Sequence, residues 1–157
     1  MYSRIYQLSC EPIPKEKYIV EDFFYDHGFT YTVADYVSGS CRRADVKKIA
    51  ENKPGIEGGI DENGEFFIIR DKEKYFKEEF KNFLKILDEL KEATLEDFAE
   101  DNSVEIRMRA LNEEYCCKTG SYTILNDKIV PFDEFVRYGV FDVKYYIGAI
   151  LEYHLML

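Results

Sequence analysis

The C-terminal stretch, residues 142–157, DVKYYIGAILEYHLML, decides the fold class. Every second residue from Tyr145 to Leu157 is apolar, and this period of two predicts a β-strand with one unbroken apolar face. The other face mixes glycine, glutamate and histidine with tyrosine, isoleucine and methionine. We therefore expect this strand at the centre of a sheet, beside a first strand over residues 1–10.

Helical and strand patterns alternate along the rest of the chain. Further strands are predicted over residues 29–37, 56–60, 65–69, 121–125 and 128–130, and helices over residues 15–27, 44–52 and 131–138. The turn-forming pairs Asn-Gly at 63–64 and Asn-Asp at 126–127 each predict a hairpin. Thr94 and Asn102, each followed three residues later by an acid, predict the starts of two more helices.

The longest helix is predicted over residues 72–92. Its apolar stripe consists of Phe76, Phe80, Phe83, Leu87 and Leu90, spaced 4, 3, 4 and 3 apart, and is widened by Tyr75, Leu84 and Ile86. A stripe of this width favours packing on a sheet over a coiled-coil seam. Residues 1–157 are therefore predicted to form one α+β domain. Its sheet would be mixed or mostly antiparallel, would include both terminal strands, and would be packed by the long helix and several shorter ones.

Negative charge is concentrated in one stretch of the chain. The chain has 31 acidic and 21 basic residues, and its net charge of −10 argues against direct binding of nucleic acid. Residues 88–105, here called the acidic segment, carry eight acids and one base, whereas the other 139 residues carry 23 acids and 20 bases. The eight acids are Asp88, Glu89, Glu92, Glu96, Asp97, Glu100, Asp101 and Glu105.

Two interpretations of the acidic segment stay open. It is either a solvated junction between helices, whose acids complement the helix dipoles, or a docking face for a basic partner protein, with mimicry of nucleic acid as one form of that role. Like-charge pairs such as Asp88 and Glu92 each cost about 0.2–0.5 kcal/mol on a continuous helix, which counts against the first. The leading hypothesis is an accessory protein that acts by protein–protein contact. The chain has the general look of an accessory protein from a bacterium or a mobile element, an impression that no motif supports.

A small-molecule or metal-dependent enzyme is the second hypothesis. Asp22 and Asp26 share one face of the first predicted helix, and His27 lies about 100° further round. Arg42 and Arg43 form a basic spot suited to an anion. Each group also has a simple structural explanation, namely a histidine at a helix end and an ordinary basic patch. The sequence therefore predicts no catalytic residue, no metal ligand and no cofactor.

Two further patterns have a structural interpretation. The D-x-N-x-E pattern of residues 61–65 resembles the opening of a calcium loop, but the last ligand position of such a loop is occupied by Lys72, so a hairpin turn is preferred. His154, on the mixed face of the last strand, is interpreted as a structural residue.

A structural homodimer is the third hypothesis. It rests on tyrosines, which supply large, stiff contact areas with a polar tip. The tyrosines of the two terminal strands are Tyr2, Tyr6, Tyr145, Tyr146 and Tyr153. If several of them were exposed together, these strands would form a contact patch between two copies.

The sequence predicts a cytosolic location without a membrane partner. Its first twenty residues contain no apolar run of signal-peptide length, and the longest uncharged apolar stretch, residues 145–151, is too short to span a bilayer. The four cysteines, Cys10, Cys41, Cys116 and Cys117, form no C-x-x-C pattern. We therefore expect free thiols in a reducing compartment.

Overall fold

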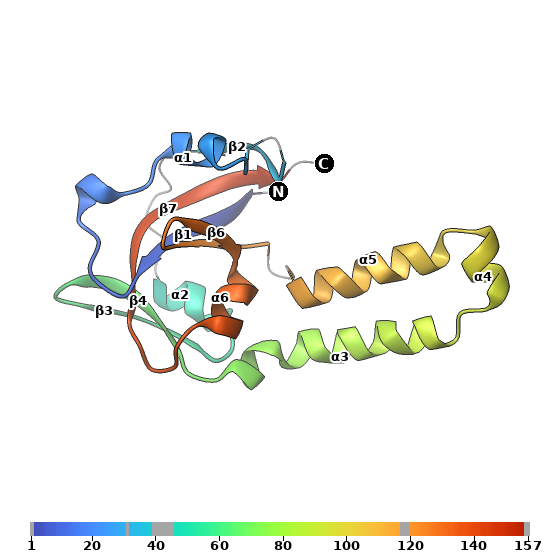
Figure 1. The fold of residues 1–157 in the computed structure, drawn as a ribbon. Helices are drawn as coiled ribbons and strands as arrows, with labels where there is room; N and C mark the ends of the chain where they lie inside the picture. Colours follow the sequence, from blue (N-terminus) through green and yellow to red (C-terminus); the bar gives the residue numbers. More distant parts are fainter. Residues whose placement is uncertain (1, 31, 39–45, 117–119, 156–157) are drawn as a thin grey trace.

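The computed structural model describes residues 2–30, 32–38, 46–116 and 120–155 (Figure 1). Within these residues the strands are β1 (Tyr2–Ser9), β2 (Ala34–Ser38), β3 (Ile56–Asp61), β4 (Gly64–Ile69), β5 (Tyr122–Leu125), β6 (Lys128–Pro131) and β7 (Tyr145–Leu155). The helices are the 3₁₀ turn η1 (Lys15–Lys17), α1 (Glu21–Asp26), α2 (Val46–Glu51), α3 (Lys72–Lys91), α4 (Leu95–Glu100), α5 (Ser103–Cys116) and α6 (Phe132–Tyr138). The α+β class is confirmed, and the single domain stays a prediction.

The described strands form one mixed sheet in the order β3-β4-β7-β1-β5-β6, with β2 also pairing with β7. The pairing of β1 with β5 is parallel, and the other pairings are antiparallel. β7 is the central strand, as predicted, with β1 along one edge and β4 and β2 along the other. Both predicted hairpins are present, and Asn126 and Asp127 have the positive φ angles, 52° and 61°, that a tight β5–β6 turn requires.

The prediction of one unbroken apolar face on the last strand is wrong, because β7 contains a bulge. Tyr6 pairs with Ile150 and Leu8 with Ile147, so two residues of β7 lie opposite the single residue Gln7. Gln7 Oε1 accepts a hydrogen bond from Ala149 N at 3.1 Å, which satisfies a backbone donor freed by the bulge. At the bulge, the alternation of side chains between the two faces of the sheet shifts by one residue. β7 therefore contributes apolar side chains to a core on each side of the sheet.

The first core lies between the sheet and α2, α6 and the start of α3 (Figure 1). Its buried side chains from strands are Tyr6, Leu8, Ile56, Phe67, Ile69, Tyr145, Ile147 and Ile150, and those from helices are Ile49, Ala50, Tyr75, Phe132, Phe135 and Val136. Phe132 is central, with its ring centroid 6.0 Å from that of Tyr6 and 5.8 Å from that of Phe67 in edge-on contacts. Each such ring contributes about 1.5–3 kcal/mol through burial.

The second core lies on the opposite face, under α1 and the segments that flank it (Figure 1). It buries Ile5, Phe24, Phe29, Ala34, Val37, Ile124, Leu151 and Tyr153. The Phe29 ring lies edge-on to both Phe24 and Tyr153, at centroid distances of 5.6 and 5.3 Å. The sheet is therefore apolar on both faces, which explains why so many of its residues are aromatic or β-branched.

The N-terminal helix and the strand after it are shorter than predicted. The predicted helix over residues 15–27 is divided into η1 and α1, and the predicted strand over residues 29–37 begins only at Ala34. Gly28, with φ of +73°, ends α1 as expected. Phe29 N donates to Phe24 O at 2.9 Å, so Phe29 lies in a turn and fills the second core instead of extending β2.

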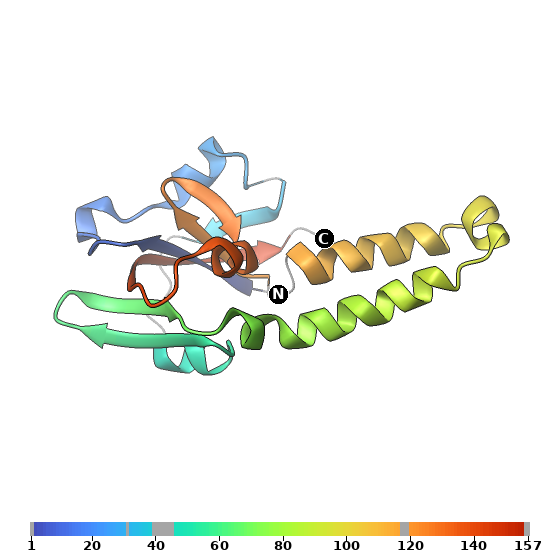
Figure 2. The same cartoon turned by 60° about the horizontal axis from the view of Figure 1, so that its bottom comes forward.

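The long helix α3 meets the sheet only at its first turns. Residues 72–116, here called the helical arm, project from the sheet, with α5 returning beside α3 (Figures 1 and 2). Tyr75 is the one buried residue of α3, and Phe76 packs against the first core. Further along the stripe Phe83, Leu87 and Leu90 are half-buried on the side that meets α5, so the expected packing of the long helix on the sheet is limited to its first turns. Helical spacing defines an apolar stripe and leaves open which surface it packs against.

Candidate functional site

Paired polar residues fix the turns of the helical arm. Thr94 Oγ1 accepts a hydrogen bond from Asp97 N at 3.1 Å, and the Asp97 carboxylate accepts one from Thr94 N at 3.0 Å. This capping box was expected from the sequence and determines where α4 begins. At the next turn Asp101 Oδ1 accepts from Ser103 N at 2.8 Å, a role that the sequence pattern assigned to Asn102.

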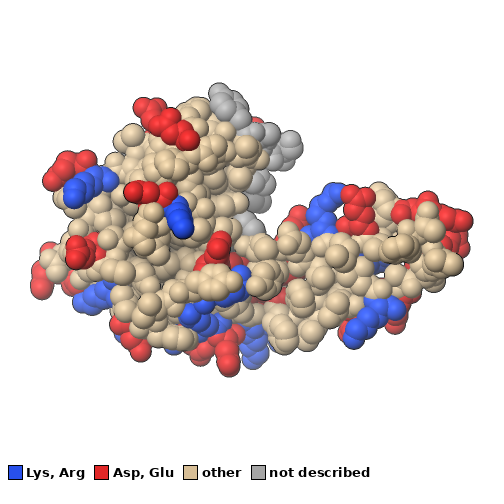
Figure 3. Space-filling view, viewed as in Figure 1, with Lys and Arg blue, Asp and Glu red and all other residues tan. Residues whose placement is uncertain are grey.

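The acidic segment forms the free end of the helical arm. It comprises the last turn of α3, all of α4 and the first residues of α5. In Figure 3, carboxylates cluster at the end of the arm furthest from the sheet, whereas acidic and basic residues alternate over the visible sheet region. The fold thus gathers the eight acids at one end of one projection. Their role as a docking site stays a prediction.

Half of these acids are engaged within the arm. Glu89 pairs with Arg107 at 3.8 Å, and Glu105 pairs with Arg109 at 3.1 Å. Both pairs are solvent-exposed, so each contributes at most about 1 kcal/mol to stability. Two more acids are the capping aspartates of α4 and α5. The remaining four are exposed, and within the described residues their side chains make no hydrogen bond or ion pair: Asp88, Glu92, Glu96 and Glu100.

Two large apolar side chains are exposed among these acids. Leu95 and Phe98 lie three residues apart on α4, so they share one face of that short helix, and they are 81% and 74% exposed. Glu96 and Glu100 lie four apart on the opposite, polar face of the helix. Our sequence reasoning missed this pair, although the signal was present, since an amphipathic α4 with no assigned packing partner leaves its apolar face uncovered.

The helical arm has almost no core of its own. No residue of α4 or α5 is buried, and Tyr75 is the only buried residue of α3. Along the arm, Phe80 and Leu84 of α3 are 58% and 41% exposed, and Met108 and Tyr115 of α5 are 54% and 49% exposed. One side of each helix packs against the other helix, and a second apolar strip on each helix faces solvent.

A hollow of about 240 Å³ lies where the arm joins the sheet region. This basal hollow is lined by Phe76, Phe80 and Phe83 of α3, Glu114 and Tyr115 of α5, Glu79 and Arg137. The Arg137 guanidinium lies 4.1 Å from the ring centroid of Tyr115 and 4.9 Å from that of Phe76, and its Nη2 donates to Tyr115 O at 2.8 Å. A more open hollow lined by Lys72 and Lys77 adjoins it. Sequence reasoning did not find either one, since the walls come from three separate helices.

The group proposed as an acid/base or metal site has a structural role at the end of α1. His27 Nδ1 donates to Phe23 O at 2.8 Å, and its ring stacks on Phe23 at 3.8 Å between centroids. Asp22 and Asp26 are exposed on the same short helix. Among the described residues there is no group of three or more His, Cys, Asp or Glu residues arranged to hold a metal ion.

The proposed anion site at Arg42 and Arg43 lies outside the described residues, as does Cys41. The side chains of Lys47 and Lys48, which would extend that site, are also outside the description, although their backbone belongs to α2. The other histidine, His154, has structural contacts, as expected: its Nδ1 lies 3.2 Å from Asp35 Oδ2, and its ring stacks on Tyr36.

The calcium-like pattern at residues 61–65 is a hairpin turn, as interpreted. The Asp61 carboxylate accepts hydrogen bonds from Lys144 Nζ, Tyr146 OH and Asn63 N, each at 2.8 Å. These donors, led by Lys144, lower the pKa of Asp61 to about 2. Asp61 therefore ties the β3–β4 hairpin to the start of β7.

The described tyrosine side chains of the terminal strands do not form the exposed patch behind the homodimer hypothesis. Tyr6, Tyr145 and Tyr153 are buried in the two cores, and the Tyr146 hydroxyl donates to Asp61. The side chain of Tyr2 lies outside the description. Because β1 and β7 are interior strands of the sheet, their edges are already paired.

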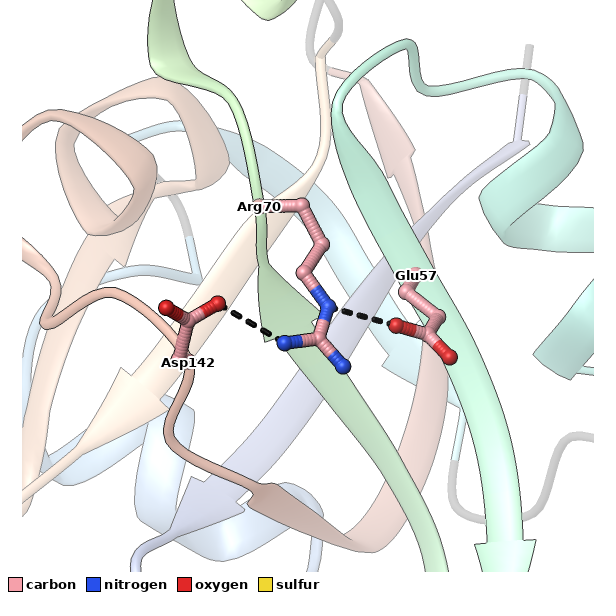
Figure 4. Close-up of polar contacts among 3 residues, drawn as sticks. All are labelled: Glu57, Arg70 and Asp142. Atoms are coloured by element: carbon pink, nitrogen blue, oxygen red, sulfur yellow. Dashed lines mark hydrogen bonds and ion pairs between the residues drawn. The ribbon is translucent and has the colours of Figure 1, made fainter.

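Two polar clusters that the sequence did not reveal also join elements of the fold. Tyr75 OH donates to the fully buried Asp133 at 2.7 Å, and burial beside them lowers the pKa of Lys53, an effect opposed by the charges of Asp133 and Glu79. On the surface Arg70 bridges Glu57 at 2.6 Å and Asp142 at 2.7 Å (Figure 4). The first cluster ties α3 to α6, and the second ties β3 and β4 to the segment before β7.

No helix in the described part of the chain combines the length and apolarity needed to cross a membrane. Comparison with known proteins found no matching family model, no matching curated protein and no matching solved structure.

Proposed function

We propose that this protein is a non-enzymatic binding protein and that the acidic segment at the end of the helical arm is its contact surface for a basic protein. One observation carries the proposal: Leu95 and Phe98 stand 81% and 74% exposed at the end of a projection, on a short helix whose other face carries carboxylates with no partner within the arm. A surface built only for stability would cover these side chains or replace them with polar ones.

The arrangement matches the anatomy of a protein interface. Such interfaces have a few large apolar side chains at the centre and a polar or charged rim around them. Full burial of Leu95 and Phe98 would contribute about 1.5–3 kcal/mol each. The carboxylates of Glu96 and Glu100 would attract and orient a basic partner, because complementary charge chiefly raises the association rate and sets specificity.

Mimicry of nucleic acid is the less favoured form of the proposal. Half of the eight acids are committed to helix caps and arginines. The end of the arm also exposes large apolar side chains among the free carboxylates. A phosphate backbone has no apolar groups of this kind, so the surface resembles nucleic acid poorly. The proposal includes a cytosolic location, which the free thiols of Cys10 and Cys116 support.

The test compares two charge-reversed chains in capture experiments from the native lysate. The arm variant carries Asp88→Lys, Glu92→Lys, Glu96→Lys and Glu100→Lys, which spares the capping aspartates. The matched control, with the same change in net charge, carries Glu11→Lys, Glu16→Lys, Asp26→Lys and Glu62→Lys, all at exposed positions outside the arm. We expect the wild type and the control to capture the same basic protein, and the arm variant to lose it.

Two further readouts identify the surface. Capture should weaken as salt is raised, because exposed charges are screened, and Leu95→Ser with Phe98→Ser should abolish it without any change in charge. Undiminished capture by both arm variants would overturn the proposal.

A further inference from the structure

The helical arm is charged oppositely at its two ends. In α3, residues 72–85 carry five lysines and three glutamates, and Arg137 lies beside them at the basal hollow. The acidic segment at the other end carries eight acids and one base. Because α3 has 20 residues, the two ends are separated by about 30 Å. The chain itself therefore contains a basic surface of the kind that the acidic segment would bind.

The shapes of the two ends are also complementary. The far end presents the protruding side chains of Leu95 and Phe98, and the near end contains the basal hollow with aromatic walls. The volume of that hollow, about 240 Å³, exceeds the roughly 150 Å³ of a cavity that accommodates benzene, so one phenyl ring fits inside it.

The exposed apolar strips of α3 and α5 lie on the same side of the arm. Phe80 and Tyr115 both line the basal hollow, so the two helices present these residues on a shared face. Leu84 follows Phe80 by four residues and Met108 precedes Tyr115 by seven, and both spacings keep a residue on the same side of its helix. This shared face therefore runs from the hollow toward the free end.

We propose that two copies of this chain pair through these faces, with their arms antiparallel, to form a four-helix bundle. In it Phe98 of each copy enters the basal hollow of the other, Leu95 packs at the rim of that hollow, and each acidic segment lies along the lysines of the partner copy's α3. The inference rests on the proposed function, because it names as the partner a second copy of this chain, which offers the basic surface of α3 although its net charge is −10. The two copies are related by two-fold symmetry, so both use the same surface and no face is left open for a third copy.

The arm is large enough for such an interface. A stable interface takes about 20–30 residues from each partner, and one face of the 45-residue arm supplies roughly that many. A two-helix layer whose inner residues are only half-buried gains a full core when a second layer packs on it, as in other four-helix bundles.

The first measurement is the molar mass of the full chain by light scattering and sedimentation equilibrium, from low to high micromolar concentration. We expect a monomer–dimer equilibrium, and Phe98→Ala should raise the dimer dissociation constant by at least about 30-fold, as for a central interface residue. Ile60→Ala, at a 66% exposed apolar residue of β3 outside the arm, is the matched control and should change nothing. A wild type that stays monomeric at high micromolar concentration overturns the inference.

A charge-swap experiment tests the antiparallel arrangement itself. One chain carries the four Asp/Glu→Lys changes of the arm variant, and the other carries Lys74→Glu, Lys77→Glu, Lys81→Glu and Lys85→Glu, all at exposed positions of α3. Each chain alone should be monomeric, and a mixture of the two should form a heterodimer, because both contacts then join opposite charges. Restoration in the mixture also shows that both variants are folded.

The outcomes separate this inference from the proposed function. A monomeric wild type that still captures a basic protein through the acidic segment leaves the function standing and removes the dimer. A dimer that forms equally well in every variant uses some other surface and also overturns the inference. A mixture that stays monomeric, although each variant melts cooperatively, overturns the antiparallel arrangement.

Discussion

The sheet region and the helical arm use the same kinds of side chain and bury them to very different degrees. In the sheet region, rings such as Phe67, Phe132 and Tyr153 are almost completely enclosed. In the arm, whose long helix has an equally regular apolar stripe, only Tyr75 is buried, and it lies at the junction with the sheet. The sheet region encloses its apolar side chains, whereas the apolar side chains of the arm are mostly half-buried or exposed.

The difference shows that an amphipathic pattern specifies a face and not the surface that covers it. A sheet with helices on both sides encloses its apolar residues within one chain. Two helices side by side can shield only the strip between them, so the other apolar residues of α3 and α5 stay in water. The exposed apolar surface of the arm is the surface that the proposed dimer would cover.

The largest expected effect tests whether stability resides in the sheet region. Phe132→Ala should lower the free energy of unfolding by about 3–5 kcal/mol, because it removes a fully buried ring and leaves a cavity. Phe80→Ala, the matched change in the arm at a ring that is 58% exposed, should cost less than about 1 kcal/mol in the monomer. Urea denaturation at low protein concentration measures both. Equal losses would show that the two regions depend on one core.

The β7 bulge provides the second test within the sheet. A Cβ on Gly148 would lie 2.7 Å from Gln7 Oε1 and 2.9 Å from Ile13 Cδ1. Gly148→Ala should therefore lower the free energy of unfolding by about 1–3 kcal/mol through overpacking. Gln7→Ala in the same background should recover part of that loss, and a double-mutant cycle measures the coupling. Purely additive losses would mean that Gln7 is not the obstacle.

Local features of the fold were predictable from the sequence because short-range chemistry determines them. The two hairpins follow from turn residues, the α4 capping box from Thr94 and Asp97, and the end of α1 from Gly28. The pairing of β1 with β7 was also predicted, since strand composition indicated a central position.

Features that depend on distant partners were not predictable. The bulge in β7 is visible only when Gln7 of another strand is placed opposite it. β2 is shorter than predicted because Phe29 lies in a turn and is buried in the second core, a contact that local sequence does not reveal. In the same way, the acids of the candidate site were found by counting charge along the chain, whereas the basal hollow required three helices to be positioned in space.

A third prediction tests whether the arm can lose order independently of the sheet. Thr94→Ala removes the capping hydrogen bond at the start of α4 and should cost about 1 kcal/mol. In a monomer this loss should appear as faster amide exchange in α4 and α5, with unchanged exchange in β1 and β7. Thr32→Ala removes hydrogen bonds to Gly28 O and Phe29 O in a turn outside the arm, and as a comparison it should leave exchange in α4 and α5 unchanged. Faster exchange throughout the sheet would show that the arm and the sheet unfold as one unit.

The smallest expected effect concerns acid stability in the sheet region. The pKa of Asp61 is lowered to about 2, chiefly by the hydrogen bond from Lys144, so the folded state favours the charged carboxylate. A depressed pKa contributes stability above the unfolded value of about 3.9, and this contribution is lost as the pH falls from about 4 through 2. Asp61→Asn cannot titrate, so the difference in free energy of unfolding between wild type and variant should shrink over this window and stay constant above pH 5 or so. A difference in free energy of unfolding that is unchanged down to pH 2 would contradict this prediction. It would show that the stabilising contacts of Lys144 and Tyr146 with residue 61 do not depend on the carboxylate charge.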